Sequence, residues 1–168
     1  MVVFTQRYVT ESIAGTVIRI SIGLLLWFGC AVARADLLAQ PNSPSVQCLA
    51  LAMYWEARGE GRLGMEAVAF VVLNRVRNPN FPNSVCAVVF QGGESPPCQF
   101  SWWCDGKSDR PRDAIQWRQA TRSAENLLSR RKIDPTRGAL YFHSTAVRSA
   151  WHRRQRPTVR IGGHVFYR

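Results

Sequence analysis

Hydrophobic residues recur at the spacing of one helix face between residues 46 and 57, and this pattern predicts a first helix. A serine at position 43 or 45 is placed to cap its start, and two glycines soon after residue 57 end it. The next segment, residues 65–76, is hydrophobic on nearly every side. A helix of that kind is expected in the centre of the core.

Two further helices are predicted by their first residues. Ser84 is suited to cap a short helix that runs through Phe90. Pro111 stands where first-turn prolines stand, and it predicts a long polar helix over residues 112–131 with a single apolar stripe.

The end of the chain changes character. Residues 139–143, 157–161 and 164–167 form short hydrophobic and aromatic runs, and Gly162 and Gly163 separate the last two. These runs predict short strands, with a hairpin turn at the glycine pair. Because the helices come first and a small sheet comes last, the expected fold class is α+β.

The first 35 residues have the features of a signal peptide. Arg7 and Arg19 precede an apolar run over residues 20–32, and Ala33-Arg34-Ala35 supplies a cleavage site. A retained anchor helix is the alternative, but the run is short for a membrane span. We therefore expect a signal peptide over 1–35, a linker over 36–45 and one folded domain over 46–168. Its expected location is the periplasm of a Gram-negative envelope or the medium, without stable membrane insertion after cleavage.

Export changes how the cysteines are interpreted. Four lie beyond the predicted leader, and an even number in an oxidising compartment suggests two disulfides, for which three pairings exist. We favour a short loop closure and a link between two helices. A metal site is disfavoured because no C-x-x-C pair is present. The favoured pairings are Cys98 with Cys104 and Cys48 with Cys86.

The chain carries a formal net charge of +11. A basic surface favours polyanions or an anionic cell envelope. Nucleic acid is the general alternative, but an exported protein rarely meets it, so no nucleic-acid partner is expected.

Glu56 is the candidate catalytic residue. It lies at the end of an otherwise apolar helical run and is flanked by Tyr54 and Trp55. A carboxyl group in such a poorly solvated place should have a raised pKa, so that it can donate a proton to a leaving oxygen. The alternative is a structural carboxylate that is bonded to Arg58.

A sugar-binding loop and a strand supply further candidates. Aromatic faces stack on pyranose rings, while amide and hydroxyl groups bond to sugar oxygens. The alternative is that the loop aromatics only cover the disulfide, and Tyr141 is equally suited to packing. Tyr141 and His143 alternate along a predicted strand and would point to the same face. The candidate substrate-binding residues are Gln99, Phe100, Ser101, Trp102, Tyr141 and His143, with weaker cases for Trp103 and Trp151.

No metal or cofactor is expected. His143, His152 and His164 match no zinc signature, and the chain contains no glycine-rich phosphate loop.

Several motifs together resemble the SleB-type cell-wall hydrolases, a family that includes the spore-cortex-lytic enzymes. The similarity extends over nearly the whole region after the leader. The combination of an E-A-R-G-E block with a downstream N-R-V is specific, although each piece alone is weak. The matching stretches are residues 55–60, 66–69, 72–76, 81–85, 88–91, 98–102, 138–143 and 161–166.

The resemblance implies a domain related to lysozymes and lytic transglycosylases, with a helical lobe and a small C-terminal β lobe. It implies cleavage of the β-1,4 bond between N-acetylmuramic acid and N-acetylglucosamine in peptidoglycan glycan strands, with Glu56 as the acid. A separate peptidoglycan-binding domain like that of the spore enzymes is not expected here, and four cysteines follow the predicted leader, so specificity for spore cortex is not implied. We expect a monomer.

A second catalytic carboxylate is the open question, because hydrolytic glycosidases use two. Glu60 would lie about 6 Å from Glu56 at Cβ if the helix continued, but one helix face cannot easily flank both sides of a sugar. Glu60 is therefore expected to bond to a backbone group or to Arg58 or Arg62. A lytic transglycosylase needs a single acid. The alternatives are a hydrolase that uses Glu60 or Asp105, and a non-catalytic binding module.

Overall fold

The computed structural model describes residues 42–95, 97–147 and 155–168. The predicted signal peptide, most of the predicted linker, Trp151 and His152 lie outside these residues. Among the described helices, none combines the length and the apolar character that a membrane span requires.

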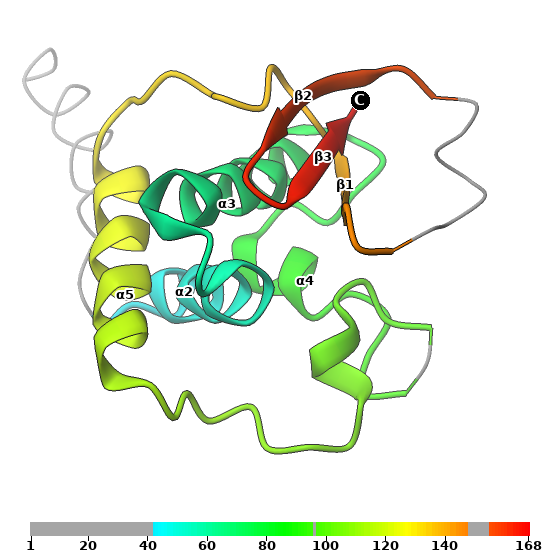
Figure 1. The fold of residues 1–168 in the computed structure, drawn as a ribbon. Helices are drawn as coiled ribbons and strands as arrows, with labels where there is room; N and C mark the ends of the chain where they lie inside the picture. The colour runs from blue at the N-terminus through cyan, green and yellow to red at the C-terminus, as the bar shows by residue number, and fades with distance from the viewer. Residues whose placement is uncertain (1–41, 96, 148–154) are drawn as a thin grey trace, which may run out of the picture. The chain divides into compact units, whose positions relative to one another are not determined.

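Helices form the first part of the described domain and strands form the last part, so the predicted α+β class is confirmed (Figure 1). Helix α5 packs against one side of α2 and α3, and α4 packs against α2 away from it. A short 3₁₀ helix, η1, lies in the loop between α4 and α5. The bounds are α2 Pro44–Ala57, α3 Gly61–Arg77, α4 Val85–Val89, η1 Ser101–Cys104 and α5 Ala114–Ser129.

Side-chain caps fix where two of these helices begin. The Ser43 hydroxyl accepts a hydrogen bond from the backbone N–H of Val46 at 3.3 Å, and Pro44 follows in the first turn of α2. The Ser84 hydroxyl accepts from the N–H of Ala87 at 3.3 Å and begins α4. Both capping predictions are confirmed, with Ser43 rather than Ser45 as the cap of α2.

The start of α5 differs from the prediction. Asp113, two residues after Pro111, caps this helix, and its carboxylate accepts from the N–H groups of Ile115 and Gln116. The Tyr54 hydroxyl accepts hydrogen bonds from the N–H groups of Arg112 and Asp113 at 3.1 and 3.0 Å. Because Asp113 is the cap, α5 begins at Ala114, two residues later than predicted, and ends at Ser129.

Helix α3 lies between two hydrophobic clusters, which explains why its sequence is apolar on nearly every side. Met65, Val68 and Val72 pack into the larger cluster, which the helices share. Ala67 and Val71 face the other way and pack against Ile161 and Phe166 of the sheet, together with Ala139. The predicted central position of this helix is confirmed.

The sheet has three antiparallel strands in the order β1-β3-β2, with bounds β1 Tyr141–Ser144, β2 Pro157–Ile161 and β3 His164–Tyr167. Phe142 pairs with Phe166 across β1 and β3, and Ile161 pairs with His164 across the hairpin. Gly162 has a φ of +54°, a conformation that glycine adopts without strain, and it turns the predicted hairpin.

Disulfides join Cys48 to Cys86 and Cys98 to Cys104, which are the two favoured pairings. The first links α2 to α4. The second closes the loop that carries η1 and therefore holds the residues of the predicted sugar-binding loop together.

Candidate active site

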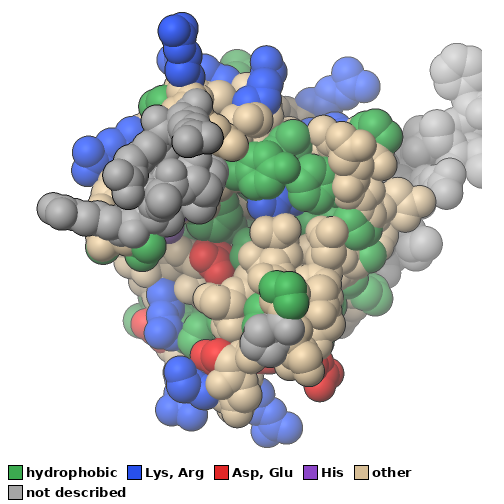
Figure 2. Space-filling model, turned by 90° about the vertical axis from the view of Figure 1, so that its right-hand side faces the viewer, with side chains coloured by type: hydrophobic (Ala, Val, Ile, Leu, Met, Phe, Trp, Pro, Cys, Tyr) green, Lys and Arg blue, Asp and Glu red, His purple; other side chains and the backbone are tan. Residues whose placement is uncertain are grey.

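Glu56 lies at the end of α2 and lines a cleft of about 340 Å³ between the helices, the η1 loop and the sheet. Figure 2 shows that this face of the molecule is hollowed near its centre, where an acidic side chain lies among hydrophobic and polar neighbours. The described residues that line the cleft are Glu56, Arg75, Cys98, Gln99, Phe100, Ser101, Phe142, His143, Ser144, Val147 and His164.

Burial raises the pKa of the Glu56 carboxyl group to about 7, from an ordinary value of 4.5. The positive charge of Arg75 opposes this shift and lowers the pKa, as does the indole N–H of Trp102. That N–H is buried and has no hydrogen-bond partner among the described residues, which leaves it available to the nearby carboxyl group. A substantial fraction of Glu56 is therefore protonated at neutral pH.

Arg58 does not neutralise Glu56. Its guanidinium donates a hydrogen bond to the Tyr54 hydroxyl at 3.2 Å and lies over the rings of Tyr54 and Trp55, 5.2 and 4.9 Å from their centroids. Among the described residues, Glu56 makes no ion pair within 4.0 Å. These contacts argue against the alternative in which Glu56 is a structural partner of Arg58.

Arg75 is the buried cation of the cleft, with an exposed fraction of 2%. Its Nε donates to the carbonyl oxygen of Leu140 at 2.7 Å, which ties α3 to the start of β1. Its guanidinium also lies between aromatic rings, with Phe81 at 5.3 Å and Phe100 at 5.7 Å from their centroids. Burial, opposed by the nearby phenol of Tyr141 and by Glu56, lowers the pKa of Arg75 to about 10, so it stays charged at neutral pH.

The η1 loop contributes most of the predicted sugar-binding residues. Gln99 and Ser101 are exposed and line the cleft, and Phe100 lines it with a buried ring. Trp102 does not line this cleft with the other three. It is buried against Phe100 and Phe90 and lines an adjacent pocket of about 320 Å³ together with Trp55.

Trp103 packs against Phe90 with ring centroids 4.2 Å apart. It lines neither the Glu56 cleft nor the adjacent Trp55 pocket among the described residues.

Strand β1 carries both Tyr141 and His143, at alternate positions. His143 lines the cleft, and its ring nitrogens bond to the Tyr167 hydroxyl at 2.9 Å and to the carbonyl oxygen of Ser144 at 2.8 Å. The Tyr141 ring lies 6.2 Å from the ring of Phe81 and 5.8 Å from the guanidinium of Arg75, which lines the cleft. Contact of Tyr141 with the sugar therefore stays a prediction, as does its alternative role in packing.

Glu60 is not positioned as a second catalytic acid. Helix α2 ends at Ala57, so Glu56 and Glu60 do not share a continuous helix face. The Glu60 carboxylate accepts a hydrogen bond from the backbone N–H of Gly163 at 2.7 Å, and Glu60 is absent from the described lining of the cleft. The expected bond to a backbone group is present.

Asp105, the other candidate for a second catalytic acid, does not line the Glu56 cleft either. It is exposed, it pairs with Lys107 at 3.3 Å, and it lines the adjacent pocket rather than the Glu56 cleft. Within the described ranges, no group of three or more His, Cys, Asp or Glu side chains is arranged to hold a metal ion.

The profile of the cell wall hydrolase family matches residues 59–167 of the chain. The chain belongs to this family. The match begins three residues after Glu56, so the candidate acid lies just outside the matched range.

This cell wall hydrolase is similar to longer proteins. It is 37% identical over 127 residues to the spore cortex-lytic enzyme of Bacillus subtilis, an alignment that covers 74% of the chain and 38% of that enzyme. It is 36% identical over 122 residues to the spore cortex-lytic enzyme of Halalkalibacterium halodurans, which covers 72% of the chain and 34% of that enzyme. The chain therefore spans well under half the length of these two relatives.

Two solved structures of catalytic domains are similar to this chain over most of their own length. The crystal structure of the catalytic domain of Bacillus cereus SleB matches with a TM-score of 0.56 and 31% identity, covering 74% of the chain and 89% of that domain. The catalytic domain of the germination-specific lytic transglycosylase SleB from Bacillus anthracis matches with a TM-score of 0.56 and 32% identity, covering 74% and 93%. The predicted family and fold are confirmed.

Sequence reasoning assigned no role to two cleft residues of this cell wall hydrolase, Arg75 and His164. Both lie inside family motifs that the sequence shows, but the spacing of residues did not predict that either side chain would lie in the Glu56 cleft. His164 is buried, and its Nδ1 has no hydrogen-bond partner among the described residues. Burial lowers the pKa of His164, although the charge of Glu60 opposes this, so the ring is neutral at neutral pH.

Proposed function

We propose that this domain cleaves the β-1,4 bond between N-acetylmuramic acid and N-acetylglucosamine in peptidoglycan, as a lytic transglycosylase with Glu56 as its single acid and base. One observation carries the proposal: Glu56, with its raised pKa, is the one carboxyl group among the described residues that line the cleft. The similarity to the Bacillus anthracis protein, a germination-specific lytic transglycosylase, supports the same reaction class.

In the first half of the proposed reaction, the protonated carboxyl group of Glu56 donates its proton to the glycosidic oxygen. The bond between that oxygen and C1 of the muramic residue breaks, and positive charge develops at C1. Arg75 and the indole N–H of Trp102 stabilise the carboxylate that Glu56 becomes, because both favour its charged form.

In the second half, the Glu56 carboxylate accepts the proton of the C6 hydroxyl group on the same muramic residue. The C6 oxygen bonds to C1 and closes a 1,6-anhydro ring, so no water is consumed. Glu56 regains its proton and the cycle is complete. The exposed amide of Gln99 and hydroxyl of Ser101 line the cleft, and in this proposal they bond to sugar oxygens.

A hydrolytic muramidase or glucosaminidase is the competing reaction, and it requires a base or nucleophile across the sugar from Glu56. The engagement of Glu60 with Gly163 and of Asp105 with Lys107 argues against both named candidates. A non-catalytic binding module would have no use for a half-buried carboxyl group with a pKa of about 7 in its cleft.

We also propose that the protein acts outside the cytoplasm, in the periplasm of a Gram-negative envelope. Two disulfides support an oxidising compartment, and the pattern of residues 1–35 supports export. The spore enzymes' restriction to cortex is not part of this proposal, because the chain spans only part of those relatives.

The proposal is tested by incubating purified sacculi with the wild-type chain and with Glu56→Gln. The substitution keeps the size of the side chain and removes its transferable proton. We expect the wild type to clear the turbidity and Glu56→Gln to lose at least about a hundredfold of the rate while it still binds sacculi. Clearing by Glu56→Gln at the wild-type rate would refute the assignment of the acid.

A further inference from the structure

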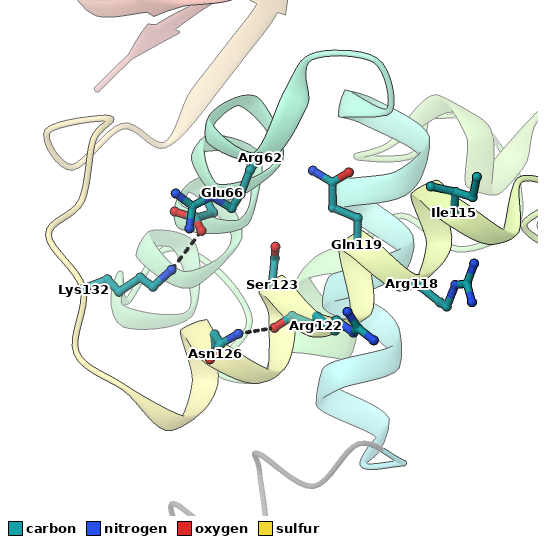
Figure 3. A pocket seen from close by; sticks show the side chains of 9 residues that line it. All are labelled: Arg62, Glu66, Ile115, Arg118, Gln119, Arg122, Ser123, Asn126 and Lys132. Carbon is teal, nitrogen blue, oxygen red and sulfur yellow. Dashed lines mark hydrogen bonds and ion pairs between the residues drawn. The ribbon is translucent and has the colours of Figure 1, made fainter.

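A second groove, of about 500 Å³, lies between the first turns of α3 and one face of α5 (Figure 3). Arg62 and Glu66 come from α3, and Lys132 follows the end of α5. The α5 residues recur at three- and four-residue spacing, so they share one helix face. They are Ile115, Arg118, Gln119, Arg122, Ser123 and Asn126. None of these nine residues lines the Glu56 cleft.

The groove has an excess of positive charge. Lys132 forms an ion pair with Glu66 at 2.8 Å, which neutralises that carboxylate. Arg62, Arg118 and Arg122 form no ion pair with any described residue, and all three are exposed. Guanidinium groups bind carboxylates and phosphates through paired hydrogen bonds. The groove is therefore suited to a ligand that carries more than one anionic group.

The neutral lining narrows the class of ligand. Figure 3 shows Gln119 and Ser123 rising from α5 toward α3, and Ser123 is 5% exposed, which places a polar side chain at the base of the groove. Ile115 is 67% exposed at one end. A phosphate-rich surface needs only cations and makes no use of these neutral side chains. A short peptide instead offers amides to the polar groups and a methyl group to Ile115.

We infer that this groove binds the acidic peptide stems carried by peptidoglycan glycan strands, at a site separate from the one that cleaves the sugar chain. The inference rests on the proposed function, which makes peptidoglycan the substrate. Stem peptides carry several carboxylates, which match the unpaired Arg62, Arg118 and Arg122. The stem site anchors the enzyme on a peptide-bearing strand and leaves the Glu56 cleft open.

The binding test uses the free tetrapeptide L-Ala–γ-D-Glu–meso-diaminopimelate–D-Ala and titration calorimetry. The protein is the full chain, as wild type, as Glu56→Gln and as the double variant Arg118→Gln/Arg122→Gln. The matched control is Arg156→Gln/Arg160→Gln, which removes the same charge from exposed positions at and before β2. We expect the wild type, Glu56→Gln and the control to bind equally, and the α5 variant to lose at least about tenfold in affinity.

A second measurement compares cleavage of intact sacculi with cleavage of glycan strands from which an amidase has removed the stems. The α5 variant should be slower only on intact sacculi. Absence of tetrapeptide binding by the wild type overturns the inference, as does equal loss in the control variant. Binding to anionic phospholipid vesicles but not to the tetrapeptide overturns it in favour of a membrane surface. Tetrapeptide binding by Glu56→Gln is independent of cleavage, so failure of the proposed reaction is recognised separately.

Discussion

The carboxylate of Glu60 accepts a hydrogen bond from the backbone N–H of Gly163 at 2.7 Å, across 103 positions of sequence. The contact joins the turn between α2 and α3 to the hairpin between β2 and β3. A Cβ atom at Gly163 would lie 2.8 Å from the Glu60 carboxylate, and one at Gly162 would collide with it. The two glycines thus make room for the acid, and the acid holds the hairpin beside the cleft.

This contact predicts that Glu60 stabilises the fold and takes no part in the chemistry. Glu60→Gln keeps an acceptor for the Gly163 N–H, so its turnover should stay within about threefold of wild type. Glu60→Ala removes the acceptor and should lower the free energy of unfolding by about 1–3 kcal/mol. Urea denaturation and sacculus clearing measure the two effects. Abolished turnover in a folded Glu60→Gln protein would instead make Glu60 a catalytic group.

The raised pKa of Glu56 predicts how cleavage depends on pH. The general acid is active only when protonated, so kcat/KM should decline about tenfold per unit as the pH rises above about 7. A soluble fluorescent peptidoglycan fragment allows the profile to be measured. A decline that begins near 4.5, the ordinary value for a glutamate, would show that the carboxyl group is not desolvated in the working enzyme.

The same pKa predicts a stability effect with a definite sign. The folded state holds the Glu56 proton more tightly than the unfolded state, so this group's contribution to stability declines as the pH rises from 4.5 to about 7. Glu56→Gln removes that dependence. The variant should therefore gain about 1–3 kcal/mol relative to wild type between pH 4.5 and pH 8, because one pKa unit corresponds to about 1.4 kcal/mol. Urea denaturation of both proteins at the two pH values measures their free energies of unfolding. If the difference between variant and wild type is the same at both pH values, the pKa of Glu56 is not raised in the folded protein.

Arg75 should determine the pH at which kcat/KM begins to decline. Its charge lowers the pKa of Glu56, so Arg75→Gln should move the decline in kcat/KM to higher pH, whereas Arg75→Lys keeps a charge and should leave the decline at a pH nearer to that of wild type. Both variants lose the bond to Leu140 and should be less stable, by about 1–3 kcal/mol. The pH profile separates the two roles, because a merely structural residue would lower the rate without moving the pH of the decline.

The helical part of the fold could be predicted because local signals determine it. Ser43 and Ser84 are capping residues, and hydrophobic spacing identified α2 and α3. The predicted start of α5 is two residues early, because the prediction rests on Pro111 and not on Asp113, whose carboxylate caps the helix. This cap is also a local signal that the sequence shows.

The candidate acid could be predicted, but most of its surroundings could not. Glu56 lies in an apolar run, and burial follows from that run directly. The positions of Arg75 and His164 around it depend on how α3 and β3 fold back toward α2, which spacing does not encode. Strand alternation predicted that Tyr141 and His143 share one face of β1, and it could not predict that Tyr141 would also lie beside Phe81 and Arg75.

The most direct test of the proposed reaction is the mass of the sugars that the wild-type chain releases from purified sacculi. Transfer of the glycosidic bond to the C6 hydroxyl gives muropeptides that end in 1,6-anhydro-muramic acid, each one water lighter than its hydrolysed counterpart. We predict anhydro products from the wild type and none from Glu56→Gln. Products that end in reducing muramic acid or reducing N-acetylglucosamine would contradict the single-acid mechanism and require a second catalytic group.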